Sequence, residues 1–103
     1  MTELNDLFER NRAWAERTRA EDPDFFRRLS DGQAPKLLWI GCSDSRVTPD
    51  RALDLQPGSV FVHRNIANLM GLQDPNGLAA LSYAVDVLGV EHVVVCGHTG
   101  CGR

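Results

Sequence analysis

Three short, uninterrupted apolar runs constrain the fold of this chain more than any other feature. They are LLWI at residues 37–40, VFV at 60–62 and VVVC at 93–96. Runs of this length without polar alternation are typical of strands buried on both faces of a parallel sheet. Helix signals separate them, because Thr48-Pro49 opens a short helix and Asp74-Pro75 a longer one. The alternation of strand and helix predicts an α/β fold with right-handed parallel crossovers.

The flanking segments are expected to be helical. The longer crossover helix has an apolar face and ends at Gly89; the residues of that face are Leu78, Leu81, Val85 and Leu88. At the N-terminus an apolar stripe near the helical period predicts a helix whose stripe packs in a core or an interface; it consists of Leu4, Leu7, Phe8 and Trp14. A second short helix is expected at about residues 23–30.

Composition excludes several classes of function. The 103 residues carry 11 basic and 14 acidic side chains, a net charge of −3, and no basic cluster beyond Arg27-Arg28, which argues against a nucleic-acid partner. No apolar run approaches the ~20 residues of a membrane helix, and the N-terminus lacks a signal-peptide core. We therefore expect a cytoplasmic protein without a membrane partner. Its three cysteines, an odd number, favour thiol or metal chemistry over disulfides.

The chemistry is expected where the first and third strands end, because function in open α/β sheets gathers at the carboxyl ends of strands. The first strand runs into Cys42 and the third into His98 and Cys101. If the strand order is 2-1-3, these turns lie side by side. Two cysteines and one histidine form a ligand set known from catalytic zinc, which leaves a fourth position open.

Asp44 and Arg46 follow Cys42 closely and allow competing arrangements. Asp44 is either the fourth zinc ligand or a carboxylate held by Arg46 in a two-pronged hydrogen-bonded pair. The second arrangement leaves room for a water molecule on the zinc, whose pKa the metal can lower to ~7. A purely structural ion pair is a further alternative.

Three motifs in register resemble the signature of β-class carbonic anhydrases of bacterial type: CSDSR (42–46), FVHRNIAN (61–68) and CGHTGCG (96–102). They correspond to the N-terminal half of such a protein. The resemblance implies that Cys42, His98 and Cys101 bind Zn²⁺. It also implies that Asp44 and Arg46 form a gating pair, and that the reaction is the reversible hydration of carbon dioxide to bicarbonate and a proton.

The resemblance carries further expectations. Gln56 corresponds to a substrate donor in plant-like members, and Trp39 with Arg64 to part of a non-catalytic bicarbonate pocket in a bacterial subgroup. Gln56 as a turn residue and Arg64 as a plain surface cation are the alternatives. Residues 1–33 would form a helical arm packed on a partner subunit of a homo-oligomer, a dimer or tetramer, and residues 34–103 a truncated zinc-binding α/β domain.

Two other functions stay open. The same fold and metal would suit a hydrolase of carbonyl sulfide or carbon disulfide. Alternatively, the chain is a catalytically silent zinc-binding fragment or interaction module, because the family's fourth strand is not in this sequence. Residues 93–96 would then form an exposed apolar edge.

Overall fold

The computed structural model describes residues 3–102. The chain divides into two compact units, with the boundary between Gly32 and Gln33. No helix within the described range is both long enough and apolar enough to cross a membrane.

The first unit consists of two helices, α1 (Leu4–Glu21) and α2 (Phe25–Ser30), as the sequence predicts. Asp22 ends α1 and joins it to α2, since its carboxylate accepts two hydrogen bonds from the Arg28 guanidinium at 2.7 and 3.3 Å. Trp14 of α1 meets the rings of Phe25 and Phe26 edge to face, with centroids 6.5 and 5.5 Å away. No residue of either helix is buried.

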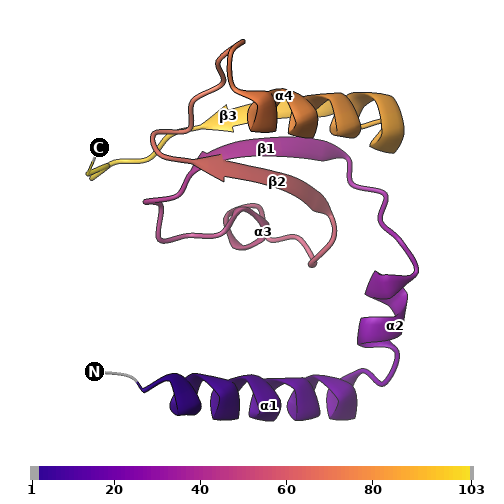
Figure 1. Cartoon of the computed structure of the whole chain (residues 1–103). Coiled ribbons are helices and arrows are strands. Elements are labelled where there is room, and N and C mark those ends of the chain that lie inside the picture. Colours follow the sequence, from indigo (N-terminus) through magenta and orange to yellow (C-terminus); the bar gives the residue numbers. More distant parts are fainter. Residues whose placement is uncertain (1–2, 103) are drawn as a thin grey trace. The chain divides into compact units, whose positions relative to one another are not determined.

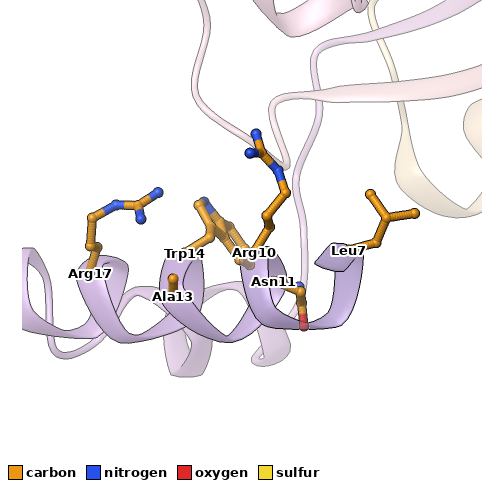
Figure 2. A pocket seen from close by; sticks show the side chains of 6 residues that line it. All are labelled: Leu7, Arg10, Asn11, Ala13, Trp14 and Arg17. Atoms are coloured by element: carbon orange, nitrogen blue, oxygen red, sulfur yellow. The ribbon is translucent and has the colours of Figure 1, made fainter. Parts of the chain in front are cut away.

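One face of α1 combines apolar and basic side chains. The predicted apolar stripe is exposed, with Leu4 63%, Leu7 49%, Phe8 54% and Trp14 44% accessible. Figure 2 shows Arg10 and Arg17 on either side of Trp14 on this helix, and together with Leu7 they line a shallow hollow. Residues spaced by three and four positions share a helix face, which accounts for this grouping.

The second unit is built on a three-stranded parallel sheet. Its strands are β1 (Leu37–Cys42), β2 (Val60–Asn65) and β3 (His92–Cys96), in the order β2-β1-β3. The predicted strand order is confirmed. In Figure 1 the three arrows point the same way, so the carboxyl ends of the strands share one edge of the sheet.

The central strand is the most deeply buried of the three, although Leu37 and Trp39 are only half-buried. Leu38, Ile40 and Cys42 of β1 are 0–1% exposed. By contrast, Val62 of β2 and Val95 of β3 are 43% and 56% exposed. The expectation that all three runs are buried on both faces is therefore wrong for β2 and β3 and only partly correct for β1. Among the described residues each of these strands has a neighbour on one side only.

The helices of this unit lie in the two crossovers that connect the strands. The first crossover contains α3 (Pro49–Ala52). The second contains α4 (Pro75–Ser82), which continues into a π-helical segment, η1 (Tyr83–Leu88). Asp74 caps α4 by accepting the N–H of Asn76 at 3.0 Å. Gly89 ends the helix in the left-handed conformation, with φ of 67°, as predicted.

The π-helical segment changes which side chains reach the core. Ala84 is fully buried against Leu38 and Ile40, and Leu81 packs beside them. Val85, expected on the apolar face, is 48% exposed. A π-helical turn inserts an extra residue and rotates the following side chains relative to a regular α-helix. The face predicted from a uniform 3.6 period is therefore only partly correct.

Candidate metal centre

The carboxyl ends of β1 and β3 bring the three predicted metal ligands together. Cys42 closes β1, while His98 and Cys101 lie in the turn after β3. One ligand atom from each side chain lies within 4.8 Å of the other two. The parallel pairing of β1 with β3 places both strand ends at the same edge, which explains the meeting of such distant residues.

The two cysteines have the spacing that a shared metal ion requires. Their Sγ atoms are 3.7 Å apart, and both residues are free thiols. A disulfide would bring them to about 2.0 Å. Two thiolates bound to one tetrahedral zinc ion stand about 3.8 Å apart. The observed separation therefore suits zinc ligation.

His98 presents an unpaired nitrogen. Its Nδ1 lies 3.0 Å from the carbonyl oxygen of Thr99, which can only accept, so Nδ1 is the donor. In a neutral imidazole this leaves the lone pair on Nε2. Nε2 is buried and has no hydrogen-bond partner within the described residues. Buried polar atoms without a partner are rare and costly, so a metal ion at this nitrogen would satisfy the site.

The surroundings of Cys42 favour the thiolate form of its side chain. Its Sγ accepts the backbone N–H groups of Asp44 at 3.3 Å and Ala67 at 3.2 Å. Burial of the side chain raises the pKa of the Cys42 thiol. The adjacent His98 imidazole, the two backbone amides and the Cys101 thiol together outweigh burial and lower that pKa to about 6. Because the thiolate is the form that binds metals, this environment suits a metal ligand at neutral pH.

Asp44 lies beside the cluster and contacts the polypeptide on two sides. Its Oδ2 accepts the N–H of Gly102 at 2.8 Å. Its Oδ1 lies 3.5 Å from Nη2 of Arg46, whose Nη1 donates to the carbonyl of Gly100 at 3.3 Å. The Gly102 hydrogen bond, helped by Arg46 and His98 against partial burial, holds the pKa of the Asp44 carboxyl below its ordinary value. This carboxylate is therefore ionised at neutral pH.

The three residues expected to contact substrate or bicarbonate lie in different environments. Gln56 is exposed, and within the described chain its side chain makes no hydrogen bond, although its carbonyl accepts the Ser59 N–H. Trp39 is half-buried, with its indole over Gly41, where an added Cβ would come within 2.6 Å of Nε1. Arg64 is half-buried and donates to the carbonyls of Cys42 and Ser45.

Sequence reasoning missed the loop after β2. Ala67, whose amide donates to Cys42, has a φ of 73°, and Asn68 has a φ of 46°. The Asn65 side chain holds this loop by accepting the Leu69 N–H at 2.6 Å and donating to the Leu69 carbonyl at 2.7 Å. Asparagine readily hydrogen-bonds nearby backbone and is enriched in the left-handed region, so Asn65 and Asn68 are the residues that could have indicated the loop.

Comparison with known proteins identifies the family. A sequence model of the carbonic anhydrase family matches residues 37–103, which include all three strands and all three candidate ligands. The chain belongs to the carbonic anhydrase family. A carbonic anhydrase of Emericella nidulans is 50% identical over 96 residues, which are 93% of this chain and 42% of that protein.

Solved structures confirm the β class. A tetrameric β-carbonic anhydrase from Sordaria macrospora superposes with a TM-score of 0.89 at 50% identity, covering 95% of this chain and 50% of that one. A Coccomyxa β-carbonic anhydrase, solved with acetazolamide, gives 0.88 at 44% identity, covering 99% and 46%. The chain thus spans half or less of the length of these carbonic anhydrases. The comparisons do not single out bacterial members.

Proposed function

We propose that this chain carries the zinc site of an enzyme that reversibly hydrates carbon dioxide to bicarbonate and a proton. The observation that carries the proposal is the cluster of Cys42, His98 and Cys101 with its unpaired, buried Nε2. Membership of the carbonic anhydrase family supplies the reaction.

The proposed cofactor is Zn²⁺ held by Cys42, His98 and Cys101. Two thiol sulfurs 3.7 Å apart and an imidazole nitrogen form a donor set that zinc favours. When bound with an open fourth position, zinc lowers the pKa of water to ~7 and polarises an oxygen of the substrate.

Asp44 is proposed to act beside the metal ligands, as a hydrogen-bond acceptor that orients the nucleophilic water. Its Oδ2 is engaged by the Gly102 amide and its Oδ1 faces Arg46. These contacts support the paired arrangement over the ligand arrangement, because both oxygens already have partners. Arg46 is proposed to hold Asp44 in this position, and its 69% exposure would allow it to release the carboxylate.

Contacts to carbon dioxide or bicarbonate remain predictions for Gln56, Trp39 and Arg64. The exposed Gln56 side chain is free to donate to a substrate, as far as the described residues go. Nε and Nη2 of Arg64 hold backbone carbonyls, so the predicted bicarbonate pocket would depend on its remaining nitrogen, Nη1.

A homo-oligomer is proposed, with the helical arm of residues 1–33 at a subunit interface. The exposed apolar residues Leu7, Phe8 and Trp14 on α1 support this role. The Sordaria macrospora relative is tetrameric. A cytoplasmic location stays a prediction.

A catalytically silent zinc-binding module is the second candidate. The exposed apolar edge at β3, where Val93 is 45% and Val95 56% accessible, favours it, because a sheet edge of this kind is suited to pairing with another chain.

Metal analysis and stopped-flow hydration of carbon dioxide, on the 103-residue chain and on Cys42→Ser, test both candidates. The proposed function requires about one zinc per chain, hydration activity, and loss of both in Cys42→Ser. Zinc without activity would favour the silent module. Soluble protein that takes up no zinc would refute the metal site itself.

A further inference from the structure

We infer that Arg64 is a positioning residue that fixes the metal-binding turn, residues 42–45, against strand β2. The inference rests on the proposed zinc site and adds a residue to its support. Arg64 lies outside the cluster of candidate ligands, and its side chain reaches the turn through main-chain atoms.

One guanidinium holds both ends of the turn. Nε and Nη2 of Arg64 donate to the carbonyl oxygen of Cys42 at 3.1 and 2.8 Å, and Nη2 also donates to the carbonyl of Ser45 at 2.7 Å. Asp44 stands between these two residues. The positions of the ligand and of its neighbouring carboxylate are therefore set by the same side chain.

The backbone of Arg64 is held in place by the pairing of β2 with β1. It pairs with Gly41 in the parallel register of β1 and β2, one residue before Cys42. The Ser43 N–H donates to the Asn65 carbonyl at 2.8 Å, which extends this pairing by one residue into the turn. The guanidinium thus begins on a strand of the sheet, and its hydrogen bonds tie the main chain of the turn to β2 in addition to the contacts that Cys42 and Asp44 make.

The chemistry of the contact requires arginine. A planar fork with five N–H donors can serve two carbonyl oxygens at once, whereas the ammonium of lysine is a compact charge on a flexible stem. Hydrogen bonds from charged donors are also stronger than those between neutral groups. Groups that orient metal ligands from outside the first shell commonly affect metal affinity by about 10- to 100-fold.

The test measures metal binding by the full chain with Arg64→Met, Arg64→Lys and the control Arg51→Met. Arg51 is exposed on α3, and within the described residues its side chain makes no hydrogen bond or ion pair. Zn²⁺ affinity is measured by competition with a chelator, and the geometry of the site by the visible spectrum of the Co²⁺-loaded protein. Thermal unfolding of the metal-free variants reports on the fold.

Arg64→Met is expected to lose about 10- to 100-fold in Zn²⁺ affinity and to change the Co²⁺ spectrum at saturation. Arg64→Lys should recover only part of the affinity, and Arg51→Met should match the wild type. If Arg64→Met does not fold, the result for Arg64→Lys decides, with a loss of at least about threefold expected.

A variant that is less stable without metal, yet gives wild-type affinity and an unchanged Co²⁺ spectrum, would overturn the inference, because Arg64 would then serve the fold alone. Wild-type affinity in Arg64→Lys would overturn the argument from the guanidinium fork. Absence of metal binding by the wild type would instead refute the proposed zinc site, so the two failures are distinguishable.

Discussion

The Sγ atoms of Cys42 and Cys101 lie 3.7 Å apart, although the residues are 59 positions apart in the sequence. The central position of β1 makes this possible, since β1 pairs with β3 in parallel and Gly41 stands opposite Cys96. The turns that follow β1 and β3 therefore lie at the same edge of the sheet. Binding of one ion by both sulfurs would tie these turns together, so metal and sheet are expected to stabilise one another.

The stability of the metal-free chain should rise with pH because of Cys42. In the folded protein the pKa of this thiol is about 6, against about 8.5 for an ordinary cysteine. Between these values the unfolded chain binds a proton that the folded chain has released, so rising pH favours the folded state. The stabilisation should be complete above about pH 8.5 and lost as pH falls to about 6.

Urea unfolding in the presence of a chelator and a reductant checks this expectation across that pH range. Cys42→Ser should lose the pH dependence, whereas Cys96→Ser, which removes a thiol outside the cluster, should keep it. A slope that persists in Cys42→Ser would assign the effect to another group.

The sequence was sufficient for the sheet and the ligands because both depend on local patterns joined by one topological rule. Apolar runs marked the strands, and the 2-1-3 order brought Cys42 to His98 and Cys101. The conformation of residues 65–69 could not be predicted, because alanine at position 67 carries no signal for a positive φ. Similarly, nothing local distinguishes the π-helical segment at Tyr83–Leu88 from a regular helix.

The role of Arg64 could not be predicted from the sequence for a different reason. Its partners are the backbone carbonyls of Cys42 and Ser45, and every residue type offers a carbonyl. Contacts to the main chain therefore leave no pattern in the sequence. Asp44 illustrates the intermediate case, since its pairing with Arg46 was one of the predicted alternatives but its hydrogen bond from Gly102 was not.

Asp44→Asn should leave zinc binding intact and impair hydration by about 10- to 100-fold. The amide oxygen can still accept the Gly102 N–H, so the local fold is expected to persist. The lost charge removes the ion pair with Arg46 and the acceptor proposed to orient water. Zinc content and the pH–rate profile are the measurements, with Asp54→Asn on an exposed turn as the control. Identical pH–rate profiles for Asp44→Asn and wild type would contradict a role in gating.

Gly41→Ala should displace the indole of Trp39. The new Cβ would stand 2.6 Å from Nε1 and 3.0 Å from Cδ1 of that ring, closer than these atoms can approach. Overpacking of this kind costs about 1–3 kcal/mol. We expect a lower urea midpoint and a shifted Trp39 emission, measured with Trp14→Phe to remove the other tryptophan. Gly71→Ala is the matched control, because an added Cβ there meets no atom within 4 Å. Unchanged emission in Gly41→Ala would mean that Trp39 packs elsewhere in solution.

Val95→Lys should reduce self-association of the 103-residue chain. Val95 is 56% exposed on β3, which pairs only with β1 among the described residues. Its neighbour Val93 is 45% exposed. An open, apolar strand edge is a template for pairing with another chain, and lysine is a common means by which proteins prevent this.

Light scattering over a range of protein concentrations should show aggregates appearing at a several-fold higher concentration in the variant. Val87→Lys is the control, since Val87 is 65% exposed on η1 and is not part of the strand. Equal protection by both variants would point to general solubility, and only a larger effect at Val95 would identify β3 as the associating edge.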